Sequence, residues 1–245
     1  MINKKESNYK SSKEIYPFLN YLINNNKDDF IKFKLKIGEF FVKRGEEPKG
    51  ILLISKGILR ITLRNEDDNE IFTIQNLKKG DIAGVDQIIR FSNDSEIAAS
   101  TNVEGFFLDK DCFLKIITTN SKTQNFLRRI SRYEIYNTLS KLLYKKLIKS
   151  EEILNFIKEF NFVDHIKLLP PGYNQLDLNF GKYFLSSNNV DGFEVGDIIE
   201  GPISVKVTGN LPARLLNYEN IVPNNFKKIY KDKNEESKII TDKKL

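Results

Sequence analysis

The sequence predicts an α+β protein in which an antiparallel β-barrel or double-sheet roll is followed by helices and a small β-rich appendage. Four short strand-like runs follow one another from Phe33, separated by turn phrases such as RGEEPKG and KKGD. Short, evenly spaced strands of this kind are typical of closed antiparallel architectures. After residue 110 the apolar residues change to helical spacing, until the double proline of LLPPG ends the helical region.

We expect five segments along the chain. They are a helical lead-in (1–32), the barrel (33–115), a helical segment (116–168), a β-rich appendage (169–218) and a charged, disordered tail (219–245). The lead-in contains a helix over Glu14–Ile23 by its apolar spacing. The phrase ASTNVEGFFLD indicates a late strand pair with VEG at the turn. The appendage is too short for a large core of its own, so we expect it to dock on the helices or on a partner.

The helical segment has one apolar face, which predicts a helix within 122–149 and a second short helix near Glu151–Phe160. That face is made by Phe126, Ile130, Tyr133, Tyr136, Leu139 and Leu143. Lysines 141, 145, 146 and 149 lie mainly off it and indicate a solvated face. The apolar face is expected to pack on the barrel or on a second copy, so a homodimer through the 122–149 helix is one predicted assembly.

Composition excludes most catalytic classes. The chain has one cysteine, Cys112, and one histidine, His165, so it can form no internal disulfide and no metal site built from several Cys or His. It contains no phosphate-binding Gly-x-x-x-x-Gly-Lys-(Ser/Thr) loop. We therefore predict no catalytic residues, no bound metal and no enzyme activity.

Charge and hydropathy limit the partners. The net charge is +6, but only 8 of the 39 basic residues are Arg, and proteins that read DNA grooves favour Arg, so we expect no nucleic-acid partner. No apolar run approaches the roughly 20 residues that span a bilayer, and the N-terminus lacks the apolar core of a secretory signal. The expected location is cytoplasmic.

The phrase GEFFVKRGEEPKGILLISKGILRI (Gly38–Ile61) resembles the start of a cyclic-nucleotide-binding domain, the family of bacterial cAMP receptor proteins, cyclic-nucleotide-dependent kinase regulatory subunits and gated ion channels. LKKGDIAG (Leu77–Gly84) resembles the next motif of that family, and the resemblance covers about residues 33–115. It implies a β-barrel of the cyclic-nucleotide-binding type. The expected structural turn glycines are Gly38, Gly45, Gly57 and Gly80. Two of them, Gly45 and Gly57, suit turn positions with positive φ.

The ligand cassette departs from the family pattern. In members that bind a cyclic nucleotide, a Gly-Glu pair contacts the ribose hydroxyl and a later Arg-x-Ala-(Ser/Thr) motif neutralises the cyclic phosphate. Here Gly84 is followed by Val85 and Asp86, and Glu96-Ile97-Ala98-Ala99 stands in place of the Arg motif. Glu96 would repel a phosphate, and Arg90 is the nearby arginine that could substitute. The residues of this degenerate cassette are Gly84, Val85, Asp86, Arg90, Glu96, Ala98 and Ala99. No cofactor is expected, and binding of cAMP or cGMP is disfavoured.

A narrower resemblance covers the later chain. The phrases LPPG, YFLSS, GFEVGDIIEGP and VTGNLPARLL, the last at Val207–Leu216, are similar to the N-terminal regulatory region of peptidase-containing ABC exporters. This implies a regulatory or sensor domain whose partner is an ABC exporter or its membrane-bound subunit, at the inner face of the membrane. The chain is then a fragment, a split partner or a truncated relative.

The alternative function is a stand-alone transcription regulator similar to the cAMP receptor proteins, or another cyclic-nucleotide-responsive protein. A regulator of that kind needs a helix-turn-helix after residue 150. The chain has PPGY there, followed by alternating β-like phrases, which argues against the regulator.

Overall fold

The computed structural model describes residues 27–64, 71–119, 127–144, 150–159 and 166–221. Among these, residues up to 88 and 93–119, with Leu127, form one compact unit, and residues 89–92 and those from 128 onward form a second. Each unit is described by itself. The predicted helix at Glu14–Ile23, Phe126, the lysines at 145, 146 and 149, His165 and the tail from residue 222 lie outside the described residues.

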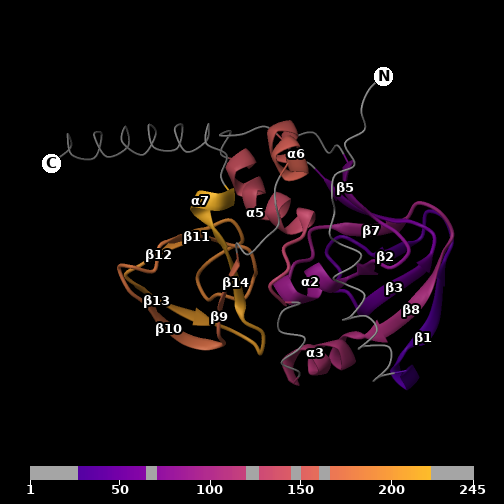
Figure 1. Cartoon of the computed structure of the whole chain (residues 1–245), viewed down its shortest axis with the longest axis horizontal. Coiled ribbons are helices and arrows are strands. Elements are labelled where there is room, and N and C mark those ends of the chain that lie inside the picture. The colour runs from indigo at the N-terminus through magenta and orange to yellow at the C-terminus, as the bar shows by residue number, and fades with distance from the viewer. Residues whose placement is uncertain (1–26, 65–70, 120–126, 145–149, 160–165, 222–245) are drawn as a thin grey trace. The chain divides into compact units, whose positions relative to one another are not determined.

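The first unit is an antiparallel roll of two four-stranded sheets, and its strands are drawn in indigo to magenta in Figure 1. One sheet has the order β1 (Ile31–Leu35), β8 (Val103–Asp109), β3 (Gly50–Lys56) and β6 (Ile82–Ala83). The other has the order β2 (Phe40–Val42), β7 (Glu96–Ala99), β4 (Leu59–Arg64) and β5 (Ile71–Leu77). The predicted fold class is therefore confirmed.

The core of the roll is aliphatic and aromatic. Strand β3 buries five consecutive residues from Gly50 to Ile54, as a central strand covered on both faces does. Phe33, Phe41 and Phe107, which are half-buried, pack as a ring cluster at the side of this core, with Phe33 stacked on Phe107 at 5.6 Å between ring centroids. Helix α3 (Lys110–Thr119) packs on β3 and β8 and buries Phe113 and Ile117. It runs across the predicted boundary between residues 115 and 116.

The turn predicted at VEG is wrong. Val103–Gly105 lie inside β8, and the chain turns earlier, at residues 100–102 between β7 and β8. Thr101 supports this turn through its hydroxyl, which accepts a hydrogen bond from the Ile58 amide at 2.9 Å. Gly105 is needed for close packing, because a Cβ there would meet the Leu53 carbonyl oxygen.

The second unit combines helices with strands. Its helices are α5 (Arg132–Tyr144), α6 (Ser150–Glu159) and the short α7 (Tyr218–Ile221), and α5 packs against α6. Helix α5 lies within the predicted range 122–149, of which residues 122–126 and 145–149 are outside the described residues. The Ser131 hydroxyl accepts a hydrogen bond from the Glu134 amide at 2.9 Å and caps α5 at its start. Three residues of the predicted apolar face, Tyr133, Tyr136 and Leu139, are buried within the chain. They are therefore covered without a second copy.

Six strands make up the β part of the second unit. A four-stranded sheet has the order β12 (Ile198–Glu200), β11 (Lys182–Leu185), β14 (Ala213–Asn217) and β9 (Ile166–Leu169). A second sheet pairs β10 (Gly172–Leu176) with β13 (Ile203–Val207). Strand β9 begins inside the predicted 116–168 helical segment, so the predicted boundary at residue 169 falls at the end of a strand.

This β part has a small hydrophobic core, and Arg214 on β14 also bonds Glu134 on α5, so the β part contacts a helix as expected. The buried cluster consists of Leu169, Leu176, Leu185, Val190, Ile199, Val205, Val207, Ala213 and Leu215. Phe180 and Tyr183 close one side of it, and the Lys167 ammonium lies 3.8 Å from the centre of the Phe180 ring. In the part of the chain that the structure describes, no helix is long and apolar enough to span a bilayer.

Candidate functional site

The cassette occupies residues 84–99, which form the short helix α2 (Val85–Arg90), a loop and strand β7. Gly84 starts it with φ of 88°, in the left-handed region that glycine adopts without strain. A Cβ on Gly84 would lie 2.6 Å from the Gly50 carbonyl oxygen and 3.1 Å from the Phe41 ring. Both the backbone angle and the close approach therefore require glycine at the start of the cassette.

The cassette loop contacts the first turn of the roll. The Gly45 amide donates to the Asn93 carbonyl oxygen at 2.6 Å, and Gly45 has φ of 80°. The other turn glycines also have positive φ: Gly38 (84°), Gly57 (91°) and Gly80 (90°). A Cβ on Gly57 would in addition meet the Asn102 carbonyl oxygen. Of these turns, those at Gly45 and Gly38 contact the cassette, since the Gly38 amide donates to the Ala99 carbonyl oxygen at 2.8 Å.

The first residues of α2 are buried or half-buried, so their role is mainly to pack the helix. Val85, at the position of the family's ribose-binding Glu, is buried, and Asp86 is half-buried. Gln87 is also buried, and its Nε2 donates to the Ser95 hydroxyl at 2.9 Å. This bond ties the helix of the cassette to the residue just before β7. An apolar Val85 cannot accept a hydrogen bond from a sugar hydroxyl.

Glu96, Ala98 and Ala99 lie on β7, in the middle of a sheet. Glu96 is opposite Thr62 on β4, and Ala99 is opposite Leu59. Glu96 is half-buried, whereas Ala98 and Ala99 are buried. The structure thus brings Glu96 to the first position of the strand where the family resemblance places an arginine. A carboxylate there provides acceptors and negative charge in place of the donors that a phosphate requires.

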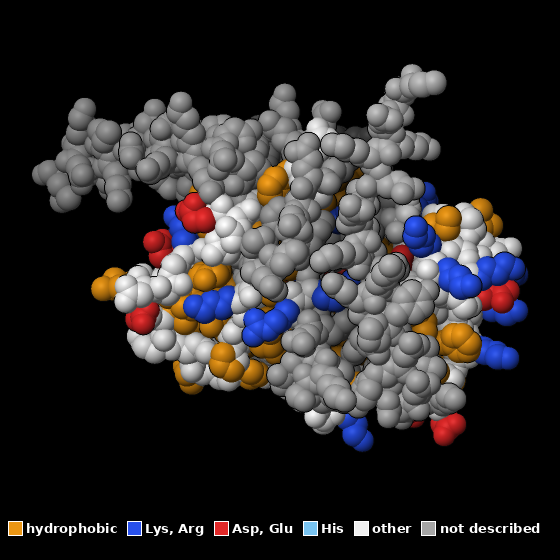
Figure 2. All heavy atoms as spheres, in the orientation of Figure 1, with side chains coloured by type: hydrophobic (Ala, Val, Ile, Leu, Met, Phe, Trp, Pro, Cys, Tyr) orange, Lys and Arg blue, Asp and Glu red, His pale blue; other side chains and the backbone are white. Residues whose placement is uncertain are grey.

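The charge balance of the cassette is acidic. Residues 84–99 contain three carboxylates, Asp86, Asp94 and Glu96, and a single basic residue, Arg90. On the visible face of the roll, Figure 2 shows Lys and Arg side chains lying beside hydrophobic and acidic ones. The position of Arg90 therefore decides whether the cassette has a cation of its own.

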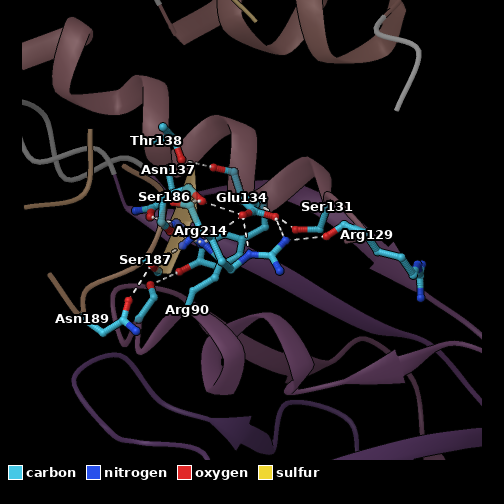
Figure 3. A network of polar contacts seen from close by, with 12 residues as sticks. Arg90, Arg129, Ser131, Glu134, Asn137, Thr138, Ser186, Ser187, Asn189 and Arg214 are labelled. Atoms are coloured by element: carbon cyan, nitrogen blue, oxygen red, sulfur yellow. Dashed lines mark hydrogen bonds and ion pairs between the residues drawn. The ribbon is translucent and has the colours of Figure 1, made fainter. Parts of the chain in front are cut away.

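Arg90 belongs to the second unit, together with Ile89, Phe91 and Ser92. Its side chain is fully buried. Its Nε donates to the Ser186 carbonyl oxygen at 2.6 Å, and its Nη2 donates to the Asn137 side-chain oxygen at 2.5 Å (Figure 3). Its guanidinium carbon lies 5.0 Å from the centre of the Tyr133 ring. The hydrogen bonds of Arg90 in the structure are thus made within the second unit.

A buried carboxylate, Glu134 on α5, is the centre of this network (Figure 3). The Arg214 Nε donates to Glu134 Oε1 at 2.8 Å and its Nη2 to Oε2 at 2.9 Å, a two-pronged pair. The Ser186 hydroxyl donates to Oε1 at 2.7 Å, and the Arg90 Nε lies 3.9 Å from the same oxygen. Burial by itself raises the pKa of Glu134, but the two guanidinium groups and the Ser186 hydroxyl hold it below its usual value. Glu134 is therefore ionised and fully paired at neutral pH.

Sequence reasoning identified Arg90 but missed its partners. Glu134 lies on a helix that the sequence marks by its apolar face, and nothing in its spacing connects it to Arg214. Arg214 does fall within the distinctive phrase Val207–Leu216. Arginine inside an otherwise apolar strand was the available signal, since a buried Arg requires a carboxylate or several carbonyl partners.

Comparisons with known proteins agree with the fold of the first unit. Residues 32–120 match the family model of the cyclic nucleotide-binding domain. A search of curated proteins gave no match to the chain.

Solved structures similar to the chain include regulatory and catalytic proteins. The regulatory subunit of a cAMP-independent protein kinase A from Trypanosoma brucei is 24% identical over 51% of this chain and 47% of that one, with a TM-score of 0.43. A putative transcriptional regulator of the crp/fnr family from Eubacterium rectale is 17% identical over 58% of this chain and 80% of that one, with a TM-score of 0.42. A cAMP-binding acyltransferase from Mycobacterium smegmatis is 18% identical over 48% of this chain and 36% of that one, with a TM-score of 0.38. The match to the kinase regulatory subunit spans about half of that protein's length.

Proposed function

We propose that residues 32–120, a β-roll of the cyclic-nucleotide-binding type, form a non-catalytic regulatory domain whose cassette no longer holds a cyclic nucleotide. The observation that carries this proposal is the charge of residues 84–99, which have three carboxylates and one arginine, with the arginine bonded inside the second unit. A cyclic phosphate carries a negative charge, and burying it without cationic or N–H partners is costly.

Glu96 is the strongest obstacle to a phosphate. Two like charges about 4 Å apart repel by about 4 kcal/mol at an effective dielectric constant of about 20, which corresponds to about a thousandfold in affinity. Glu96 is half-buried at the first position of β7, so water screens it only in part. Val85 adds to the loss, because it offers no acceptor to a ribose hydroxyl.

Arg90 is a poor replacement for the missing arginine. To reach a phosphate it would have to give up its bonds to Ser186 and Asn137, each worth roughly 1.5–3 kcal/mol for a charged donor. It would also remove one of the two guanidinium groups near Glu134. These losses would offset most of what a phosphate contact gains.

We further propose that the regulatory target is an ABC exporter or its membrane-bound subunit, on the basis of the sequence phrases in the second unit. The phrase Val207–Leu216 supplies Val207, Leu211, Ala213 and Leu215 to buried positions and Arg214 to the Glu134 network. Its distinctive composition thus has a structural cause in this fold. In the described residues after 165, strands β9–β14 stand where a transcription regulator would need a helix-turn-helix, which favours the regulatory domain over the DNA-reading alternative.

The test is isothermal titration of cAMP and cGMP into the full chain and three variants. Glu96→Gln removes the repulsion, Glu96→Arg adds a cation, and Glu104→Arg makes the same charge change at an exposed site on β8. We expect Glu96→Arg to bind at least tenfold more tightly than the unmodified chain, with Glu96→Gln between them, because each step removes unfavourable charge. The Glu104→Arg control should behave as the unmodified chain does. Measurable and equal binding by the unmodified chain, Glu96→Arg and Glu104→Arg would show that Glu96 does not block the site, and would overturn the proposal.

A further inference from the structure

One end of the roll exposes two isoleucines in adjacent turns. Ile37 lies in the turn between β1 and β2 and is 68% exposed, and Ile58 lies in the turn between β3 and β4 and is 39% exposed. We call the four segments 36–39, 56–58, 78–81 and 100–102 the turn end of the roll. Large apolar side chains gathered at one end of a domain are a candidate interaction surface.

Hydrogen bonds fix the backbone of both isoleucines. The Ile37 amide donates to the Asn102 side-chain oxygen at 3.1 Å, and the Ile58 amide donates to the Thr101 hydroxyl at 2.9 Å. Two adjacent residues of the turn between β7 and β8 therefore hold one isoleucine each. The two apolar side chains are presented by a rigid backbone, so binding through them would cost little ordering entropy.

The segment 78–81 lies beside the second isoleucine. Leu59 is opposite Leu77 in the pairing of β4 with β5, so the residue just before Leu59 and the residue just after Leu77 are neighbours. The Gly80 amide donates to the Ile54 carbonyl oxygen at 2.9 Å, which ties the same segment to β3. The four segments therefore belong to one end of the roll.

Lysines surround the two isoleucines. The turn end has four exposed lysines, at positions 36, 56, 78 and 79, and two carboxylates, Glu39 and Asp81, so its net charge is +2. Glu39 accepts a hydrogen bond from the Lys36 amide at 2.7 Å, and Asp81 accepts one from the Lys78 amide at 2.9 Å. Within the described residues, none of the four lysine ammonium groups forms an ion pair. They are therefore available to an anionic partner.

Exposed apolar side chains framed by lysines fit the surface of an anionic bilayer. The apolar side chains enter the boundary between head groups and acyl chains, while the lysines contact the lipid phosphates. The centre of a protein–protein interface is instead depleted of charged residues, and of lysine in particular. Two isoleucines among four lysines therefore favour a lipid surface over a protein partner. Hydrophobic and basic side chains also lie side by side on the face of the roll visible in Figure 2.

We propose that the turn end docks the roll on an anionic membrane surface, with Ile37 and Ile58 entering the bilayer boundary. The docking is peripheral and reversible, because two apolar side chains and four lysines bind far more weakly than a spanning helix. Every residue involved belongs to the first unit. The proposal does not depend on the state of the cassette or on an exporter.

The test is co-sedimentation of the full chain with vesicles of phosphatidylglycerol and phosphatidylcholine in equal parts, compared with vesicles of phosphatidylcholine alone. The first double variant, Ile37→Thr with Ile58→Thr, removes apolar contact and keeps both the charge and the branched shape. Its matched control is Ile31→Thr with Ile71→Thr, at isoleucines that are 57% and 52% exposed and lie at the opposite ends of their strands from the turn end.

The second double variant, Lys36→Gln with Lys56→Gln, removes two charges at the turn end. Its matched control is Lys43→Gln with Lys49→Gln, which removes two exposed charges between β2 and β3. All four substituted lysines are exposed, and urea unfolding of each variant separates a loss of docking from a loss of folding.

We expect the unmodified chain to bind the anionic vesicles and not phosphatidylcholine alone. The isoleucine variant should bind about tenfold more weakly, because the bilayer boundary no longer receives two aliphatic side chains. The lysine variant should bind at least about tenfold more weakly, because each lysine close to an anionic leaflet contributes about fivefold. Both controls should stay within about threefold of the unmodified chain, since their side chains are farther from the lipid and screened by salt.

Three results would overturn the docking. The first is no binding of the unmodified chain to the anionic vesicles. The second is an equal loss in the lysine variant and its control, which would mean that the net charge of the whole chain drives binding. The third is unchanged binding by the isoleucine variant. No nucleotide is used, so each of these results leaves the proposed state of the cassette unaffected.

Discussion

Glu134→Gln is expected to destabilise the second unit strongly. The side chain is fully buried and accepts three hydrogen bonds, two from Arg214 and one from Ser186. Glutamine has nearly the same shape, so the variant creates no cavity and isolates the charge. It leaves the Arg214 and Arg90 guanidinium groups buried beside a neutral amide, whose NH₂ replaces one of the accepting oxygens. Removing one partner of a buried ion pair costs about 3–5 kcal/mol.

The assay is urea unfolding followed by far-ultraviolet circular dichroism, since the chain contains no Trp to serve as a fluorescent reporter. The control is Glu104→Gln, which removes an exposed carboxylate 3.9 Å from the Lys34 ammonium. Exposed pairs contribute about 0–1 kcal/mol, so this control should change the free energy of unfolding little. A loss below about 1 kcal/mol for Glu134→Gln would refute the reasoning, because it would mean that the two guanidinium groups do not need the carboxylate.

Three further predictions concern pH, turns and packing. Because the folded-state pKa of Glu134 lies below its unfolded value of about 4.5, its ionised form stabilises the fold above that pH, and this stabilisation is lost as the pH falls from there through the folded pKa. Acid unfolding curves should therefore be less steep for Glu134→Gln, and identical slopes would contradict this. Gly57→Ala should lower the melting temperature clearly more than Gly38→Ala does. Both glycines have positive φ, but a Cβ on Gly57 would meet the Asn102 carbonyl oxygen, whereas nothing lies within 4 Å of a Cβ on Gly38. Leu215→Ala should cost about 2–5 kcal/mol, because Leu215 is fully buried in the core of the β part; a cost below about 1 kcal/mol in urea unfolding would show that this core is not closely packed.

The roll could be predicted from the sequence because its signals are local. Strand-length apolar runs and the glycine turns lie within a few residues of each other, and Gly45 and Gly57 have the positive φ that their turn phrases predict. The four strand-like runs predicted from Phe33 correspond to strands β1 to β5, because the first run divides into β1 and β2, which lie in different sheets. The error at VEG arose because glycine can mark a turn or a close approach, and Gly105 serves the second purpose.

The use of Arg90 could not be predicted, because its partners are distant in the chain. Ser186 is 96 residues away and Asn137 is 47 residues away. Judged from the neighbouring residues alone, a single arginine beside a degenerate cassette suggests a phosphate ligand. Only the fold brings it to α5 and the loop after β11. The start of α5 is likewise set by the Ser131 cap, which the apolar spacing alone does not reveal.

Isothermal titration of the unmodified full chain with cAMP and with cGMP tests the central claim most directly. Glu96 at the start of β7, Val85 in place of an acceptor and Arg90 bonded to Ser186 together predict no binding tighter than a Kd of roughly 10 μM, about −7 kcal/mol. Binding of either nucleotide tighter than that, abolished by a mutation in residues 84–99, would contradict the claim that this cassette has lost its ligand.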